Sequence, residues 1–550
     1  MNKTKIFIIC FFAPFIVCSQ SNYQNNNEDK SFELSKNLEI FSAVYRTLHT
    51  TYVDDIQSGD LVKTAIDAML AKLDPYTNFF PEADMEDVKM QLLGQYGGIG
   101  ALIHQKGDRV YISEPFEGLP AYEAGLKAGD EIIEVNGMNA KGKNSNQVTE
   151  VLRGQAGSDI SIKIEREGKT MEVKFKRREI KFPNVPYYGV VRNNIGYIKL
   201  NEFTQEAGNH VAEAFRSLKS KDNISGLIID LRGNGGGLLN EAVNIVNIFV
   251  EKGQPIVSTK GKLKERDQNF KTQMPPLDVN IPVVVLVDNY SASASEIVAG
   301  SLQDLDRAVI MGQRTFGKGL VQNVIPLLYN TQMKVTVSKY YIPSGRCIQA
   351  IDYSHRNIEG KAEKMPDSLR TAFKTKGGRT VYDGLGIEPD VSIESKWAPD
   401  IAIAIITKYL SFDYATEFVK KHPKIASAKD FTITDEIYND FLNFIKDKDY
   451  SYKTDTERRL EDLRKEAEQE KFDKSTLEAI EHLQQRVKDD KADDLTKFKD
   501  DIKNILLSEI VVRYYNQKGR IESLLPYDKE VNQAIDLLLN AEAYKKILKP

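Results

Sequence analysis

Three stretches in the middle of the chain repeat one pattern of apolar and small residues. Each has a short apolar run rich in β-branched residues that leads into a turn of small residues. A short apolar run bounded by turn residues is typical of a strand buried on both faces. The pattern therefore predicts an α/β region, with strands at the start of Ile224–Gly237, at Ile281–Val287 and at Arg307–Met311, and helices at Leu238–Val250 and Glu296–Leu302.

The turns after these strands carry the candidate chemistry. Asn289–Glu296 reads N-Y-S-A-S-A-S-E, and a tight strand-to-helix turn exposes a side chain at the carboxyl end of a sheet. The alternative is a serine-rich N-cap of an ordinary helix, and this stretch alone leaves both interpretations open. The glycines at Gly235–Gly237 let backbone N–H groups approach an anion. Lys318 lies among small and apolar residues, where desolvation would lower its pKa and suit it to act as a base.

A serine, an anion-binding turn and a neutral lysine together indicate Ser/Lys acyl-transfer chemistry. The set resembles the carboxyl-terminal processing peptidases, or tail-specific proteases, a family of serine proteases. The resemblance implies that Ser293 is the nucleophile and that Lys318 of T-F-G-K-G, 25 residues later (318 − 293 = 25), is the base. It also implies that Gln322 orients the lysine and that Asp304 is a supporting residue.

The same resemblance places the oxyanion hole at backbone N–H groups of Ala294 and of the glycine turn Gly235–Gly237, chiefly Gly236 and Gly237. Ser291 and Ser295 are the nearest rivals of Ser293 as the nucleophile. Asp230 and Arg232 flank the glycine turn, and we expect them to form a structural ion pair rather than to take part in catalysis.

The N-terminal part of the chain has a helical period. Apolar residues recur at steps of three and four from Leu34 to Leu48 and again from Leu61 to Leu73, which predicts helices within a region spanning 31–93. Asp74-Pro75 ends the second helix. The polar, asparagine-rich residues 20–30 predict a disordered linker.

Residues 94–178 change to short strands separated by glycine turns, with helical pieces at Ala121–Leu126 and Ser145–Leu152. Pro120–Gly137 resembles the PDZ signature, and the loop of Gly98, Ile99, Gly100 and Ala101 resembles the PDZ carboxylate-binding loop. The resemblance implies that a peptide C-terminus binds the N–H groups of this loop and adds a strand to the sheet. The apolar end of the loop is reduced to Ala101, and the alternative is a small β-rich packing domain.

Residues 397–550 are charged and helical in pattern, with few glycines. This region either caps the core or forms a surface for a homo-oligomer or adaptor, and we favour the cap. The predicted fold is thus a multidomain α/β chain. It combines a Ser/Lys protease core at 179–396, with crotonase-like layers of sheet and helix, an inserted β-rich PDZ domain of the α+β type, and helical regions at both ends.

The composition and the first 19 residues indicate which partners and which cellular location to expect. The chain has 550 residues and a net charge of −4, which argues against nucleic acid as the main partner. Residues 1–19 combine basic Lys3 and Lys5 with the apolar stretch Ile6–Val17, which predicts a cleaved signal peptide and an exported, periplasmic or cell-envelope protein. Lipidation of Cys18 is the alternative, but it is not favoured because Val17 is not a small residue. We expect no transmembrane span in the mature chain.

Several other functions are weighed against this interpretation. Gly312-x-x-x-x-Gly317-Lys318 nearly forms a Walker A loop, but Gly319 stands where Ser or Thr must hold magnesium. The six histidines are not at ligand spacing and none is close in sequence to the catalytic stretches, so we expect no metal and no cofactor. A non-catalytic PDZ scaffold and a crotonase-like acyl enzyme are the alternatives. The serine and lysine pair favours an exported serine endopeptidase that binds C-terminal tails of proteins through its PDZ domain.

Overall fold

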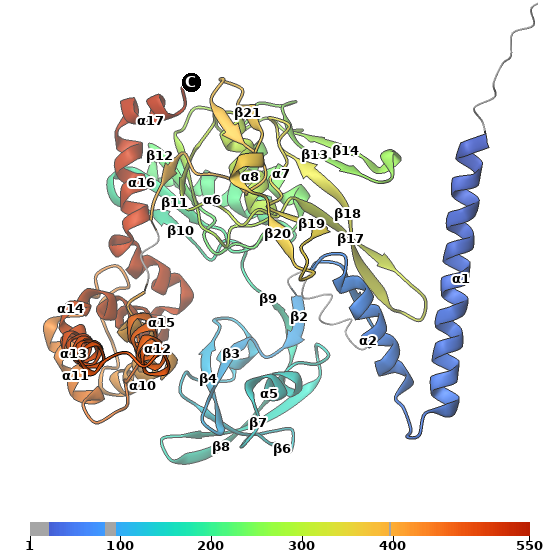
Figure 1. Cartoon of the computed structure of the whole chain (residues 1–550). Helices are drawn as coiled ribbons and strands as arrows, with labels where there is room; N and C mark the ends of the chain where they lie inside the picture. Colours follow the sequence, from blue (N-terminus) through green and yellow to red (C-terminus); the bar gives the residue numbers. More distant parts are fainter. Residues whose placement is uncertain (1–20, 83–94, 395–397, 550) are drawn as a thin grey trace, which may run out of the picture. The chain divides into compact units, whose positions relative to one another are not determined.

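A computed structural model describes residues 21–82, 95–394 and 398–549 (Figure 1), so the predicted signal peptide and Cys18 lie outside the described residues. The chain divides into two compact units, Met1–Phe79 and Phe80–Pro550. In the first unit, α1 (Ser21–Thr51) and α2 (Ser58–Ala71) confirm the predicted helices, and β1 (Asn78–Phe80) crosses the boundary. The predicted linker at 20–30 is wrong for residues 21–30, which are helical, because extending a nucleated helix costs little per residue. No helix among the described residues combines the length and apolarity that crossing a bilayer requires.

The predicted protease region is built on a six-stranded sheet in the order β10-β11-β12-β15-β16-β23. β10 is antiparallel to β11, and all other neighbours are parallel. The strands are β10 (Tyr187–Val190), β11 (Ile195–Lys199), β12 (Gly226–Asp230), β15 (Val283–Val287), β16 (Val309–Gly312) and β23 (Val391–Ser392). β12, β15 and β16 are the three strands that the apolar runs predict. Because they are adjacent and parallel, the turns that follow them meet at one edge of the sheet.

Helices from distant parts of the chain cover the two faces of this sheet. Side chains such as Ile229 and Val285 pack against α6 (Ala207–Asp222), α7 (Leu239–Asn247) and α8 (Ala294–Asp304). Their neighbours Ile228 and Val284 point to the other face and pack against α16 (Lys529–Leu539) and α17 (Ala541–Ile547). The last two helices are therefore a layer of this α/β core, which the predicted boundary between 396 and 397 leaves out.

A second sheet, which is antiparallel, lies next in the chain to the strands of the first sheet. In it β13 (Pro255–Gly261) pairs with β14 (Gln268–Lys271) and with β18 (Gln332–Tyr341), and β18 also pairs with β17 (Leu320–Pro326). Two small hairpins follow in the chain, formed by β19 (Ile351–Arg356) with β20 (Ala362–Lys364) and by β21 (Ala372–Lys374) with β22 (Thr380–Tyr382).

The predicted PDZ region has its own sheet, in the order β3-β4-β5-β7-β8, with β6 paired to β5. Its strands are β3 (Ala101–Lys106), β4 (Arg109–Pro115), β5 (Glu131–Val135), β6 (Met138–Asn139), β7 (Asp159–Arg166) and β8 (Lys169–Lys176). α4 (Pro120–Glu123) and α5 (Ser145–Leu152) confirm the two helical pieces. β2 (Gln95–Gly98) pairs with β9 (Arg178–Lys181) and so joins the two ends of the region.

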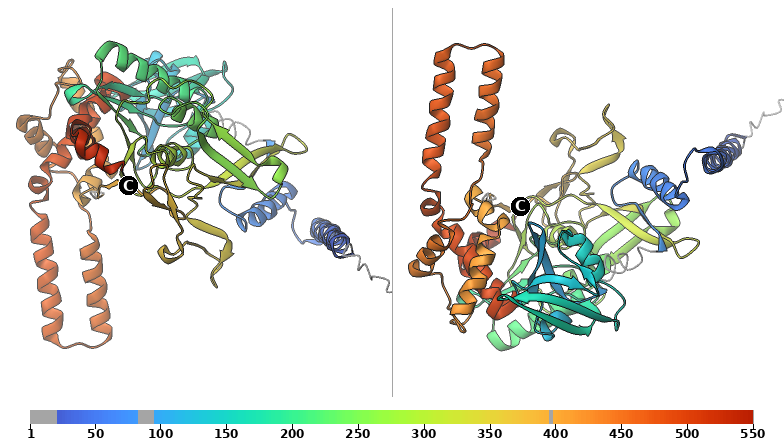
Figure 2. Two further views of the ribbon diagram at one scale, coloured as in Figure 1. Left: turned by 90° about the horizontal axis from the view of Figure 1, so that it is seen from above. Right: turned by 90° about the horizontal axis from the view of Figure 1, so that it is seen from below.

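Five of the remaining C-terminal helices pack around a separate apolar core, namely α9 (Asp400–Thr407), α10 (Leu410–Lys421), α11 (Asp435–Ile445), α14 (Asp494–Lys497) and α15 (Lys499–Leu524). The other two, α12 (Asp455–Gln469) and α13 (Lys474–Lys491), contribute no residue to this core. Figure 2 shows α12 and α13, in orange, as a long antiparallel pair that extends away from the other helices. These two helices fit the charged, helical pattern that the sequence shows for residues 397–550.

Candidate active site

The serine turn separates Ser293 from its two rivals. Ser293 has φ 55° and ψ −111°, a strained conformation for a residue that is not glycine, and α8 begins at the next residue. Ser291 and Ser295 are fully buried. The Ser291 Oγ donates to the carbonyl oxygen of Leu231 at 2.9 Å, and the Ser295 Oγ donates to that of Asn234 at 2.9 Å. Both rivals therefore serve the packing of the turn, whereas Ser293 lines a cavity.

That cavity, of about 700 Å³, collects the predicted residues from all three turns. Its walls include Ser293, Lys318, Gln322 and the glycines Gly235–Gly237, together with Tyr340 from β18. Among the described residues that line it, none is a histidine. The pattern of strands thus places a serine and a lysine on the walls of one cavity, and no described lining residue supplies the imidazole of a Ser/His/Asp triad.

Glu296 fixes the relative position of the serine and lysine segments. It is buried in the first turn of α8 and receives hydrogen bonds on both carboxylate oxygens. The backbone N–H groups of Ser293 and Lys318 donate to Oε2 at 2.8 and 2.9 Å, while the Gly317 N–H and the Thr315 hydroxyl donate to Oε1 at 2.7 and 2.6 Å. Burial raises the pKa of Glu296 to about 7, although these donors act in the opposite direction.

Tyr340 makes a second link between the same two segments. Its hydroxyl lies 2.7 Å from the carbonyl oxygen of Lys318 and 3.1 Å from that of Ser293. Burial raises the pKa of Tyr340, so the hydroxyl remains a donor at all physiological pH values. The Lys318 and Ser293 backbones are therefore held together by a carboxylate on one side and by a phenol on the other.

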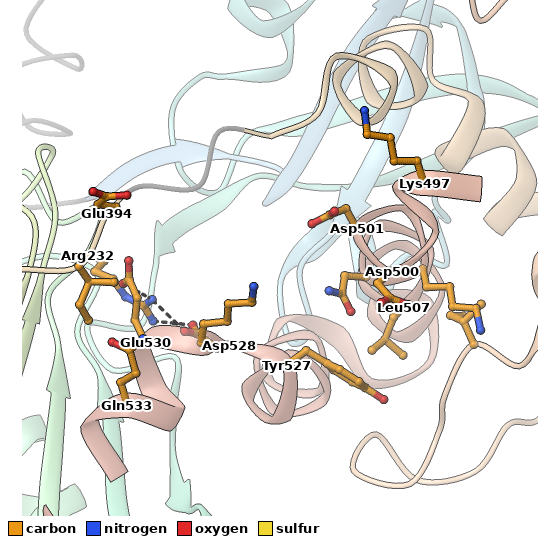
Figure 3. A pocket seen from close by; sticks show the side chains of 15 residues that line it. Arg232, Glu394, Lys497, Asp500, Asp501, Leu507, Tyr527, Asp528, Glu530 and Gln533 are labelled. Atoms are coloured by element: carbon orange, nitrogen blue, oxygen red, sulfur yellow. Dashed lines mark hydrogen bonds and ion pairs between the residues drawn. The ribbon is translucent and has the colours of Figure 1, made fainter. Parts of the chain in front are cut away.

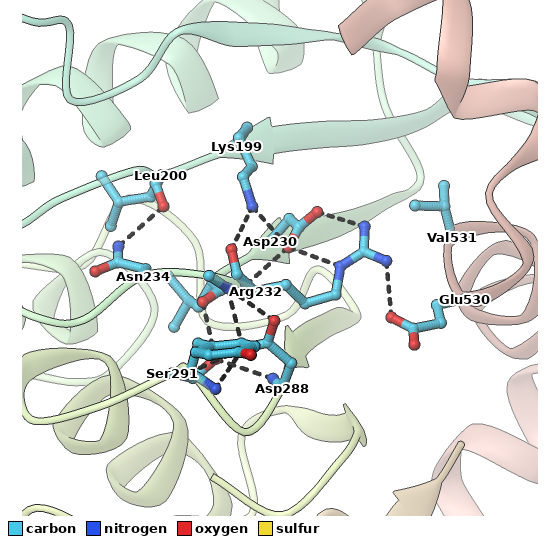
Figure 4. A network of polar contacts seen from close by, with 12 residues as sticks. Lys199, Leu200, Asp230, Arg232, Asn234, Asp288, Ser291, Glu530 and Val531 are labelled. Atoms are coloured by element: carbon cyan, nitrogen blue, oxygen red, sulfur yellow. Dashed lines mark hydrogen bonds and ion pairs between the residues drawn. The ribbon is translucent and has the colours of Figure 1, made fainter. Parts of the chain in front are cut away.

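The glycine turn packs directly against the serine turn (Figure 4). A Cβ on Gly236 would lie 2.8 Å from the Ser293 Cβ and 2.9 Å from the Ala294 nitrogen, so only glycine fits there. The Asn234 carbonyl oxygen accepts the Ala292 N–H at 3.1 Å. The two turns thus form one hydrogen-bonded unit.

One of the predicted oxyanion donors, the Gly236 N–H, already has an acceptor within the turn. The Gly236 N–H donates to the Asn234 Oδ1 at 2.9 Å, so this group serves the turn and is not directed at a substrate. The N–H groups of Gly237 and Ala294 have no acceptor within residues 21–82, 95–394 and 398–549. Gly237 and Ala294 are accordingly the pair that can bind an oxyanion, and Gly236 contributes its lack of a side chain.

Of the two remaining predicted residues, Gln322 lines the cavity that holds Ser293 and Asp304 does not. The Gln322 Nε2 donates to the Thr336 Oγ1 at 3.1 Å, and Gln322 borders the cavity from β17, next to an irregularity in the ladder. Asp304 ends α8, and the 11 residues of this helix place it about 16 Å from the serine turn. It is buried and pairs with Arg346 at 2.9 Å, and it does not line the cavity that holds Ser293.

In the PDZ region, the predicted carboxylate-binding loop connects β2 to β3. The carbonyl oxygens of Ile99 and Gly100 accept the N–H groups of Ala121 and Phe116 at 2.8 and 3.0 Å, which fixes the loop against α4. Gly100 has φ 71°, and a Cβ there would lie 2.4 Å from the Leu119 Cβ. α5 packs beside β3, as the edge of a peptide-binding groove requires.

Asp230 and Arg232 form the structural ion pair that the sequence predicts. The Arg232 Nη2 lies 2.6 Å from the Asp230 Oδ2. Burial alone would raise the pKa of Asp230, but Arg232 and Lys199 outweigh it, so this pKa lies below its usual range. Within the described ranges, no three His, Cys, Asp or Glu side chains gather as a metal site would require.

Sequence reasoning missed three residues of this site, namely Glu296, Tyr340 and Asn234. Glu296 had a detectable signal, because S-x-x-E at a helix start is the spacing of a capping box. Tyr340 had none, because its role depends on β18 passing beside the lysine loop. Asn234 lies within the glycine turn, and only the structure shows that its side chain accepts a backbone N–H.

Comparison with family models gives four matches along the chain. "Peptidase family S41" matches residues 194–355 and "PDZ domain" matches 97–176. "Probable PDZ-protease, C-terminal helical domain" matches 401–538, and "Activating protease CtpB N-terminal domain" matches 13–83. The order of these matches confirms the predicted succession of a helical region, a PDZ domain, a peptidase and a helical C-terminal region.

Individual proteins are similar over most of their length. A carboxy-terminal-processing protease of Bartonella bacilliformis is 37% identical over 358 residues, which cover 64% of this chain and 81% of that protein. A probable CtpA-like serine protease of Staphylococcus aureus strain N315 is 34% identical over 351 residues, which cover 63% of this chain and 69% of that protein. Among solved structures, a photosystem II D1 C-terminal processing protease is 27% identical, covers 65% of this chain and 93% of that chain, and has a TM-score of 0.36.

Proposed function

This chain belongs to the carboxy-terminal-processing proteases, a group of serine-type peptidases, and from this membership we propose that it is an exported endopeptidase with a Ser293–Lys318 dyad. The observation that carries the proposal is the double link made by Glu296 and Tyr340. These side chains bind the backbones of Ser293 and Lys318, which line one cavity. An arrangement of this kind holds a nucleophile and a base at a fixed separation before the substrate arrives.

In the proposed reaction, the Ser293 Oγ attacks the scissile carbonyl carbon while its proton passes to the Lys318 Nζ. The carbonyl oxygen gains negative charge and is stabilised by the N–H groups of Gly237 and Ala294. The tetrahedral intermediate collapses, the C–N bond breaks, and the protonated lysine gives its proton to the leaving amine. A water molecule then attacks the resulting ester, transfers a proton through Lys318, and releases the carboxylic acid and the free serine.

A second cavity extends the proposed substrate path. It measures about 820 Å³ and shares Leu238, Leu239, Val321 and Gln322 with the cavity that holds Ser293. Together the two cavities provide room for several residues of an extended chain on one side of the serine. This continuity favours a peptidase that cuts within polypeptides.

The PDZ domain supplies the second part of the proposal, the capture of substrate tails. A PDZ carboxylate-binding loop holds a C-terminal carboxylate with backbone N–H groups while the peptide adds to a neighbouring strand. Here Gly98–Ala101 is the candidate carboxylate-binding loop, and β3, which lies at the edge of its sheet beside α5, is the strand that a peptide would extend. Membership in the family favours this peptidase over a non-catalytic PDZ scaffold and over a crotonase-like acyl enzyme.

Export is supported by the basic and apolar pattern of residues 1–19, and we propose a periplasmic or cell-envelope location. Cell fractionation with an antibody against the chain tests it, because a cytosolic pool of uncleaved protein would contradict it.

Cleavage of fluorescently labelled casein tests the catalytic proposal. The wild type and the Ser291→Ala and Ser295→Ala variants are expected to cut, whereas Ser293→Ala is expected to be inactive with an unchanged circular dichroism spectrum. The assignment of the nucleophile fails if Ser293→Ala retains activity while one of the other two variants loses it.

A further inference from the structure

The glycine turn is also connected to the far side of the protease core, through the side chain of Arg232. Figure 4 shows the Arg232 guanidinium directed away from the serine turn, with Asp230 on one side and Glu530 on the other. Asp230 accepts from the Arg232 Nε at 3.0 Å and from Nη2 at 2.6 Å. Every other hydrogen bond of this guanidinium in the described chain goes to the C-terminal helices.

Two carboxylates at the start of α16 receive those bonds. The Asp528 oxygens lie 3.2 Å from Nη1 and 2.8 Å from Nη2, and the Glu530 Oε2 lies 2.7 Å from Nη1. The Arg232 side chain is 18% exposed, at the edge of a cavity of about 970 Å³ that Asp528 and Glu530 also line (Figure 3). A guanidinium has five N–H donors, and these contacts occupy all of them, so its position is fully specified.

The backbone on either side of Arg232 leads to the oxyanion donors. The Arg232 carbonyl oxygen accepts from the Lys199 Nζ at 2.6 Å, and the Gly233 N–H donates to Asp288 at 2.9 Å. Asn234 then connects the turn to the serine turn and, through its side chain, to the Gly236 N–H. An unbroken path of hydrogen bonds and a few peptide units thus joins α16 to Gly237.

We propose that Asp528 and Glu530 are positioning residues for catalysis, which act through Arg232 to hold the glycine turn where the Gly237 N–H meets the developing oxyanion. This proposal rests on the acyl-enzyme mechanism given above. It assigns the C-terminal helices a part in the chemistry, in addition to their part in burying the sheet. A small displacement of an oxyanion donor lowers the rate even when the substrate binds normally.

The test uses the full-length Asp528→Asn/Glu530→Gln double variant. Asparagine preserves the N-cap, where Asp528 now accepts the Val531 N–H at 3.0 Å, so α16 keeps its first turn. Cleavage is measured on an internally quenched peptide taken from the casein bond that is cut fastest. We expect kcat to fall about 10- to 100-fold with KM within about twofold of the wild type. The inhibition constant of a boronic acid analogue of that peptide should rise by the same factor.

Asp536→Asn is the matched control. Asp536 is also on α16 and also pairs with an arginine, since its Oδ1 lies 2.6 Å from the Arg192 Nη2, but Arg192 is exposed and does not touch the glycine turn. The control should keep kcat within about twofold of the wild type. If the double variant cleaves as fast as the control, or if the control loses as much activity as the double variant, the proposal is overturned.

Two further measurements distinguish a failure of the positioning role from misfolding of the variant and from a failure of the proposed mechanism. Thermal unfolding reports whether the double variant folds, and Glu530→Gln alone replaces it if it does not. If the wild type and Ser293→Ala are equally inactive or equally active, the proposed mechanism fails instead, and that result is distinct from a failure of the positioning role.

Discussion

The two faces of the six-stranded sheet are equally buried but differ in what their helices do. α7 and α8 come directly after β12 and β15 in the chain, and the turns before them carry the glycines and Ser293. α16 and α17 come from the end of the chain and carry no residue of the cavity around Ser293 among the described residues. The catalytic face is therefore the one covered by the helices that directly follow β12 and β15. A turn can place a side chain at the sheet edge only where its strand ends.

The catalytic face should give the largest effect on activity. In Lys318→Arg the positive charge remains, but a guanidinium does not release its proton in the physiological range, so it cannot accept the proton of Ser293. Cleavage of casein should fall by at least about 1000-fold, and thermal unfolding should change little. Lys318→Ala should be equally inactive, and a small amine added to it would restore part of the rate. Substantial activity in Lys318→Arg would disprove the lysine base.

Truncation of a core residue on either face of the sheet should lower the free energy of unfolding by a similar amount. Ile245 in α7 and Ile535 in α16 are 0% and 2% exposed, so truncation of either to alanine leaves a cavity in one layer of the core. Each change should lower the free energy of unfolding by about 2–5 kcal/mol, as measured by urea denaturation. If Ile535→Ala costs less than about 1 kcal/mol while Ile245→Ala costs several, then α16 and α17 are a dispensable cover and not a core layer.

The sequence predicts one face of the sheet better than the other. The continuous apolar runs at β12 and β15 predict strands buried on both faces, and the small residues after them predict the site. Which helices cover the second face could not be read, because the apolar positions of α16, such as Ile535 and Leu538, fit any apolar partner. The role of Tyr340 could not be predicted either, because it arises from contacts between segments that are distant in the sequence.

The buried carboxylate of α8 should make the catalytic face sensitive to pH. Burial raises the pKa of Glu296 from 4.5 to about 7, so the native state binds this proton more tightly than the unfolded state does. The resulting stabilisation is complete below about pH 4.5 and is lost as the pH rises through about 7, a change of about 3 kcal/mol. The difference in unfolding free energy between the wild type and Glu296→Gln should therefore decrease between pH 5 and pH 8. Parallel curves would contradict this pKa.

The smallest effect is expected from the PDZ loop, which belongs to neither face of the protease sheet. In Gly100→Ala the new Cβ would lie 2.4 Å from the Leu119 Cβ, so the loop must shift. Gly107→Ala is the matched control, because Gly107 also has a positive φ but a Cβ there would contact nothing. Calorimetry on full-length protein carrying Ser293→Ala should show about tenfold weaker binding of a peptide tail to the Gly100 variant alone. Without the Ser293 change, cleavage of proteins should slow more than cleavage of short peptides. If both variants bind the tail equally well, then Gly98–Ala101 does not hold the carboxylate, and tail capture must be sought elsewhere on the PDZ domain.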